Sequence, residues 1–140
     1  MTDYKFTFAL QRKGGNKGLK YGNEMLSAND RMHYAVKMQI TRHLRELSRY
    51  AVFSEKGLTE CVYSPDKPCK VIVIINPPSR RRVDPPNFYP TVKALIDGMT
   101  DAKMWTDDNA KVIKAMTFIY GDVTKDKKYH VDILIEGVEK

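Results

Sequence analysis

Hydrophobic and polar residues alternate along residues 4–10, so that Tyr4, Phe6 and Phe8 share one side. A repeat of two is typical of a β-strand with one buried face. Residues 71–75 form an unbroken run of Val and Ile, which predicts a strand buried on both faces. Residues 111–120 and 129–136 predict two more strands. The polar, Lys-rich link between them, residues 121–128, predicts a hairpin.

A spacing of three and four replaces the repeat of two in two other segments and predicts helices there. The first is residues 28–50, where either Ser27 or Asn29 can cap the first turn. The second is residues 90–99, with Pro90 suited to the first helical position. The expected buried faces consist of Met32, Val36, Ile40, Leu44 and Leu47 in the first helix, and of Val92, Leu95, Ile96 and Met99 in the second.

The order of these elements predicts a single α+β domain over residues 1–140, with a four-stranded mixed sheet and two helices. A hydrophobic content of 42% is ordinary for a globular protein. No apolar run approaches the roughly 20 residues that a membrane-spanning helix needs. The N-terminus carries an early acid and no signal-peptide pattern. We therefore expect a cytoplasmic protein.

The positive charge is concentrated in the N-terminal part of the chain. Of the net charge of +7, residues 1–50 contribute +6, from ten Lys or Arg against four acids. They include a loop rich in Gly, Lys and Asn at residues 13–23, which lacks the pattern of a phosphate-binding P-loop. Such a surface favours a polyanion as partner, because Lys and Arg neutralise phosphates. The alternative is a solvated basic face that serves only solubility.

Cysteine and histidine spacing does not predict a zinc site. Cys61 and Cys69 are too few and too far apart for one. A cytosolic chain keeps its thiols reduced, so we expect both cysteines to be structural. His33, His43 and His130 show no metal-ligand spacing either.

The residues suited to catalysis gather between positions 79 and 109. Asp84 follows an arginine run, Lys93 and Asp97 are one helical turn apart, and Asp108 precedes the third strand. Asp84 and Asp108 both fall at junctions of strands and helices, where a fold can bring carboxylates together around Mg²⁺. Phosphodiester cleavage needs such a metal, an activated water and a positive group for the developing charge. Lys93 is a candidate for that positive group.

Each of these features also has an ordinary structural explanation. Asp84 before two prolines is a common turn residue. Lys93 and Asp97 are spaced as a surface ion pair, and residues 107–109 are a good turn sequence. Arg80, Arg81 and Arg82 have the pattern of a solvated basic patch.

The same stretch resembles the RusA family of Holliday junction resolvases. The pattern there is an arginine run, D-x-D-N, a helix with K-x-x-x-D, and W-x-D-D. The chain matches it with RRRVD up to Asp84, then Asn87, then KALID at residues 93–97 and WTDD at residues 105–108. In addition, SANDRMH at residues 27–33 is similar to the segment that opens the first helix in RusA-like phage and prophage proteins.

The resemblance implies a homodimer that binds a four-way DNA junction and nicks two opposed strands, in recombination and repair in a bacterial cytoplasm. It implies Mg²⁺, or Mn²⁺, bound by acidic residues. Asp84 and Asp108 then match the first and last motif acids, and Lys93 matches the essential lysine. The remaining metal ligands would be Asp97, Asp107 and Asn87. The expected DNA-binding residues are Arg80, Arg81, Arg82, Asn29, Arg31, Lys17 and Lys20.

The chain departs from the family pattern at two points. Pro86 stands where the second acid of D-x-D-N belongs, and Lys93 follows Asn87 by six residues instead of three. The result resembles a D-x-x-N-x-x-P-T-x-K subgroup, in which Asn87, Asp97 or Asp107 would supply the missing ligand. Two alternatives stay open: a catalytically weak junction-binding protein of the same fold, and an RNA-binding α+β module suggested by charge and fold class alone.

Overall fold

The computed structural model describes residues 2–13 and 17–140 as a single four-stranded mixed sheet with two main helices, which confirms the predicted α+β class. The elements in chain order are β1 (Tyr4–Leu10), the 3-10 turn η1 (Leu19–Tyr21), α1 (Tyr34–Lys56), β2 (Cys69–Asn76), the 3-10 turn η2 (Pro85–Phe88), α2 (Tyr89–Asp101), β3 (Ile113–Tyr120) and β4 (Tyr129–Gly137). The strand order is β1-β4-β2-β3. β4 runs antiparallel to β1 and β2, and β2 runs parallel to β3.

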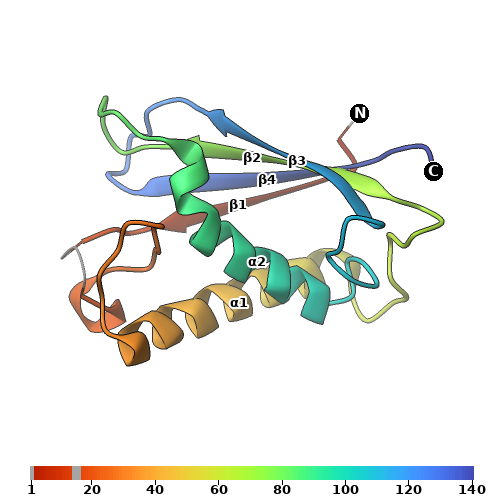
Figure 1. Ribbon diagram of the computed structural model, residues 1–140, viewed down its shortest axis with the longest axis horizontal. Helices are drawn as coiled ribbons and strands as arrows, with labels where there is room; N and C mark the ends of the chain where they lie inside the picture. The colour runs from red at the N-terminus through yellow and green to blue at the C-terminus, as the bar shows by residue number, and fades with distance from the viewer. Residues whose placement is uncertain (1, 14–16) are drawn as a thin grey trace.

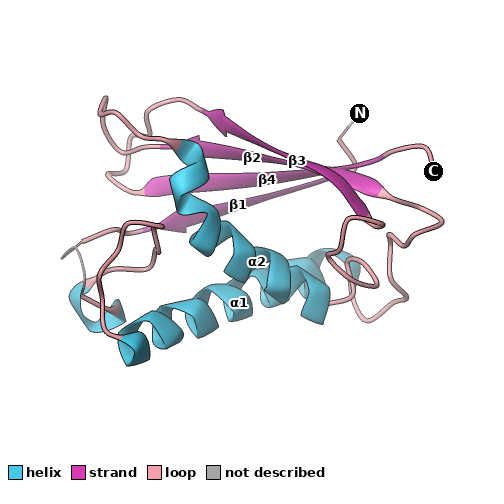
Figure 2. Cartoon of the chain, viewed as in Figure 1, coloured by secondary structure: helices cyan, strands magenta, loops and turns pink. Residues whose placement is uncertain are grey.

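Both helices lie against one face of the sheet, and the other face is open (Figure 1, Figure 2). Alternate residues of β2 and β4 are therefore buried under the helices, while the residues between them are half-buried. This corrects the prediction that residues 71–75 are buried on both faces. Among the described residues, neither helix has the length and apolarity needed to cross a lipid bilayer.

The predicted hairpin at residues 121–128 is wrong, because β2 lies between β3 and β4 in the sheet. The link instead passes the end of β2, where the Thr124 N–H donates to the Pro77 carbonyl at 2.9 Å. A polar link between two strands predicts only that the chain reverses. The inserted strand comes from an earlier part of the chain, which local sequence does not reveal.

α1 begins at Tyr34 and ends at Lys56, about 1.7 turns later than predicted at both ends. Its N-cap is His33, whose ring Nδ1 accepts the Ala35 N–H at 3.1 Å, and not Ser27 or Asn29. The preceding segment forms a turn around Asp30, because its carboxylate accepts the Ser27 N–H at 2.8 Å and pairs with Arg12 at 2.6 Å. These bonds keep residues 27–31 out of the helix.

The two helices approach closely at Gly98. A Cβ at this position would lie closer than 3.0 Å to the Ser48 hydroxyl and to the Arg45 carbonyl, so only glycine fits. Ser48 is fully buried and donates its hydroxyl to the Leu95 carbonyl at 2.5 Å. This contact fixes α2 against α1 and thereby sets the position of the polar side of α2.

Candidate functional site

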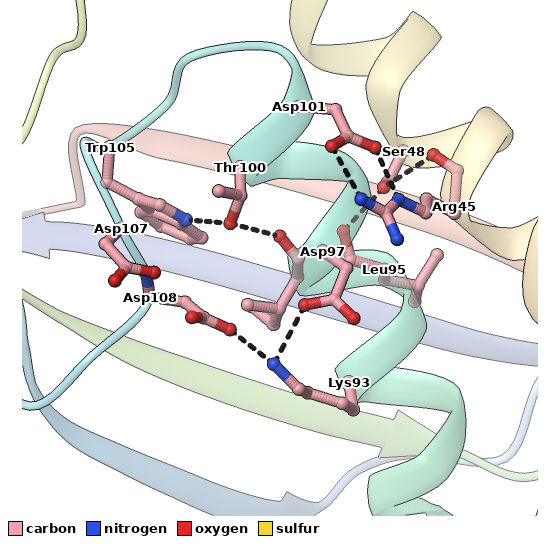
Figure 3. Close-up of polar contacts among 11 residues, drawn as sticks. Arg45, Ser48, Lys93, Leu95, Asp97, Thr100, Asp101, Trp105, Asp107 and Asp108 are labelled. Atoms are coloured by element: carbon pink, nitrogen blue, oxygen red, sulfur yellow. Dashed lines mark hydrogen bonds and ion pairs between the residues drawn. The ribbon is translucent and has the colours of Figure 1, made fainter.

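Lys93, Asp97 and Asp108 form one polar group, called the lysine–aspartate cluster below. The Lys93 ammonium lies 2.8 Å from a carboxylate oxygen of Asp97, one turn further along α2. It lies 2.5 Å from a carboxylate oxygen of Asp108, which belongs to the segment between α2 and β3. Figure 3 shows the lysine side chain directed between the two acids. The Lys93 side chain is 44% exposed, so solvent and ligands can reach its ammonium.

The segment that carries Asp108 is fixed by a buried tryptophan. Trp105 is 1% exposed and donates its indole N–H to the Thr100 hydroxyl at 2.7 Å, near the end of α2. Asp107 is exposed, and its carboxylate accepts the Asp108 N–H at 2.7 Å and the Asn109 side-chain amide at 3.1 Å. These bonds close a turn that holds the Asp108 side chain toward Lys93.

The charges of the lysine–aspartate cluster stabilise one another. Partial burial by itself would lower the pKa of Lys93, but the hydrogen bonds to Asp108 and Asp97 outweigh it and raise the pKa above its usual value. The Lys93 hydrogen bond lowers the pKa of Asp108 below its usual value, against the opposing effect of partial burial. Lys93 is therefore positive and Asp108 negative at neutral pH.

Asp84 and Asn87 belong to η2, where Asp84 is the N-cap and Asn87 lies within the turn. The Asn87 N–H donates to the Asp84 carbonyl at 2.9 Å. Together with Ser27, Arg81 and Arg82 they line a shallow depression of about 150 Å³. The exposed Asp84 side chain makes no hydrogen bond or ion pair with any residue that the structure describes.

The predicted metal ligands do not form a complete site in this arrangement. Within residues 2–13 and 17–140, no three His, Cys, Asp or Glu side chains gather closely enough to hold a metal ion. Mg²⁺ requires a near-octahedral set of oxygen ligands, usually with one or two carboxylates, and Lys93 occupies the place between Asp97 and Asp108. A divalent ion therefore does not fit these residues as they lie. That Asp84 and Asp108 share an ion stays a prediction.

The predicted DNA-binding residues lie on the surface, and several meet at one end of the molecule. Arg80, Arg81 and Arg82 are exposed on the segment after β2, and so are Lys17, Lys20, Asn29 and Arg31 on the segment before α1. Both segments lie at the left end of the molecule in Figure 1. A hydrogen bond of 2.8 Å from the Ala28 N–H to the Asn87 carbonyl joins them. Residues 14–16 of the predicted basic loop are outside the described residues.

Asp101 extends the polar side of α2, where it pairs with Arg45 of α1, and was not singled out from the sequence. The two side chains form a bidentate pair with distances of 2.5 and 2.8 Å that joins the helices (Figure 3). The Arg45 guanidinium lowers the pKa of Asp101 below its usual value. Lys93, Asp97 and Asp101 follow one another at a spacing of four, which is the signal that could have revealed Asp101.

Comparison with protein-family models and with curated protein sequences gives no match. Among solved structures, the chain is similar to thiamine monophosphate kinase from Aquifex aeolicus, with 10% sequence identity and a TM-score of 0.30. The similarity covers 97% of this chain and 33% of the kinase, so the chain spans about a third of that protein's length.

Proposed function

We propose that the chain is a metal-dependent, structure-specific endodeoxyribonuclease that resolves four-way DNA junctions by paired nicking. The observation that carries the proposal is the lysine–aspartate cluster. Its three members come from two motifs of the resemblance, K-x-x-x-D and W-x-D-D, and their charged groups meet within 2.8 Å at an accessible surface. Mg²⁺, or Mn²⁺, is the cofactor of the proposal, and its ligand set would have to form when DNA binds.

Lys93 is suited to act on a phosphate. An ammonium group has three N–H donors, and Asp97 and Asp108 accept two of them. The third donor is free for a non-bridging phosphate oxygen, on which negative charge grows in the transition state. Asp97 and Asp108 hold the ammonium in place, so its stabilising effect requires little reorganisation when the charge develops.

The surface at the depression containing Asp84 is suited to bind the DNA backbone. Arg81 and Arg82 line this depression, the neighbouring Arg80 is exposed, and Arg is a strong ligand for phosphate. Lys17, Lys20, Asn29 and Arg31 extend this surface along the segment before α1. In a homodimer, the two copies of this surface would bind the arms of one junction.

A second candidate function is junction binding with weak or no cleavage. One observation favours it: in the described parts of the chain, no group of three potential metal-ligating side chains is assembled. This candidate keeps the basic surface and the fold, and it differs only in the chemical step.

Incubation of the purified chain with a synthetic four-way junction separates these functions. A linear duplex of the same sequence is the control, each with Mg²⁺, Mn²⁺ or EDTA, and a denaturing gel detects nicks. The proposal predicts paired nicks in the junction alone that require a divalent ion. Junction binding on a native gel without nicks supports the second candidate. Preferential binding of structured RNA in competition would contradict both.

A further inference from the structure

β3 carries apolar side chains that the fold leaves uncovered. The strand has the sequence IKAMTFIY and lies at one edge of the sheet, yet Ile113 is its only buried residue. Ile119 and Tyr120 are 42% and 44% exposed. The opposite edge is different, because Phe6, Phe8 and Leu10 of β1 are buried beneath the helices. The helices thus cover the inward side chains of β1 more completely than those of β3, where Met116 and Phe118 are only partly buried against the core and Phe118 contacts Tyr89 of α2 edge-on.

The free edge of β3 also lacks the usual protection against strand pairing. Proteins protect exposed edges with charges, prolines, short strands or a covering segment. β3 has eight residues, no proline and one charged residue, Lys114 at its start. Its one irregularity against β2 lies at that same end, between Cys69 and Lys70. From Ala115 to Ile119 the strand pairs with β2 and with no other described strand, so its outer side can accept one. At the end of β3, the Tyr120 hydroxyl donates to the Arg81 carbonyl at 3.1 Å.

We infer that β3 pairs antiparallel with β3 of a second copy of this chain, with Thr117 on the two-fold axis. Gly121 donates its N–H to the Ile75 carbonyl of β2 at 2.8 Å. In a parallel ladder, the backbone N–H and C=O groups of alternate residues point to the same neighbouring strand. Like the Gly121 N–H, the backbone groups of Thr117 and Ile119 therefore point to β2, and those of Met116 and Phe118 point away from it. When the pairing is centred on Thr117, Met116 lies opposite the partner's Phe118, and these two residues exchange backbone hydrogen bonds.

The sequence of β3 suits this register and so favours a second copy over an unrelated strand. Lys114 would lie opposite the partner's Tyr120, so no like charges face each other. Ala115 would lie opposite the partner's Ile119, and the two Thr117 side chains would form a favourable threonine pair. An edge that complements itself is what a two-fold dimer requires.

The pairing has a geometric consequence for the lysine–aspartate clusters. Directly opposed residues of an antiparallel pair point to the same face, so both helix layers lie on one side of the joined sheet. The starts of the two β3 strands would be about 26 Å apart along the strand direction, at about 3.3 Å per residue. Both clusters, to which α2 and the segment just before β3 contribute, would thus face the same side. The interface itself rests on β3 alone and does not depend on the proposed nuclease activity.

Sedimentation without DNA is the first test. The wild type should be a dimer at micromolar concentration. Thr117→Lys places two like charges face to face across the axis, so it should weaken dimerisation at least tenfold. Ala9→Lys adds the same charge to an exposed position of the other edge strand, β1, and should have no effect. A monomeric wild type, or equal dimerisation by both variants, would overturn the proposal.

Cross-linking tests the register. Opposed residues of this kind have Cα atoms about 4.5 Å apart, within reach of a disulfide. In a Cys61→Ser background, Thr117→Cys should therefore form a covalent dimer under mild oxidation. Ala115→Cys or Ile119→Cys alone should not, since like residues would be about 13 Å apart along the strands, but a refolded mixture of the two should. Equal cross-linking at all three positions, or at none, would contradict the pairing.

Discussion

At the scale of single residues, Lys93 differs from an ordinary surface lysine because two segments of the chain hold its ammonium. The pair with Asp97 follows from a spacing of four on a helix and could be predicted from the sequence. The second carboxylate, Asp108, comes from 15 residues along the chain, and only the anchored turn after α2 brings it there. A lysine that serves solubility alone does not need two such partners, which is why we propose a role with phosphate for Lys93.

The Arg45–Asp101 pair yields a pH-dependent prediction. The arginine lowers the pKa of Asp101 in the folded state. The resulting stabilisation is therefore present above the unfolded pKa, near 3.9, and is lost as pH falls through the folded value. Asp101→Asn should reduce the free energy of unfolding by about 1 kcal/mol at pH 7, because the pair is partly exposed. The difference from the wild type should shrink below about pH 4.

Urea unfolding at pH 7 and pH 3 measures this effect. Asp122→Asn is the matched control, since its side chain forms no ion pair with any described residue. A difference between the wild type and Asp101→Asn that stays constant across this range would show that Arg45 does not act through the charge of Asp101.

At the scale of secondary structure elements, hydrophobic periodicity predicted the type of every main helix and strand, and β1 to the residue. It failed where a contact between residues distant in sequence determines where an element begins or which strands pair. Asp30 and Arg12 hold residues 27–31 out of α1, and β2 enters the sheet between β3 and β4. The candidate site divides in the same way: the spacing of Lys93 and Asp97 is local, whereas Asp108 reaches Lys93 from another segment of the chain.

The contact between the helices provides the prediction at this scale. Gly98→Ala should lower the free energy of unfolding by about 3 kcal/mol, because the added methyl would overlap the Ser48 hydroxyl and the backbone of Arg45, which cannot rotate away. Thermal and urea unfolding measure the loss. Ser54→Ala places an alanine at an exposed position of α1, and its free energy of unfolding should stay within about 0.5 kcal/mol of the wild type. Equal stability of wild type and Gly98→Ala would mean that the helices are further apart than described.

At the scale of the whole molecule, the chain has a net charge of +7, and two exposed segments at one end carry several of its basic side chains. Junction affinity should therefore fall steeply with salt, because bound Lys and Arg release counterions from DNA. Arg80→Ala and Arg82→Ala should each reduce the slope of log affinity against log salt by about 0.9. Fluorescence anisotropy at several salt concentrations measures these slopes.

Lys140→Ala is the control for the salt series. Lys140 pairs with Asp66 at 2.8 Å at the end of the molecule away from the arginine segment (Figure 1). Its removal should leave the slope unchanged. If the control and the two arginine variants alter the slope equally, the arginine segment is not the DNA-binding surface.

The central claim is that Lys93 acts on the phosphate during cleavage, and the single-turnover rate of junction cleavage by Lys93→Met tests it most directly. The exposed Lys111→Met is the matched control. With Mg²⁺ and saturating enzyme, Lys93→Met should cleave about 100-fold or more slowly, because one donor to the developing charge is lost. Its junction Kd should stay within about threefold, since the lost contact matters mainly in the transition state. Cleavage at the wild-type rate by bound Lys93→Met would contradict the claim.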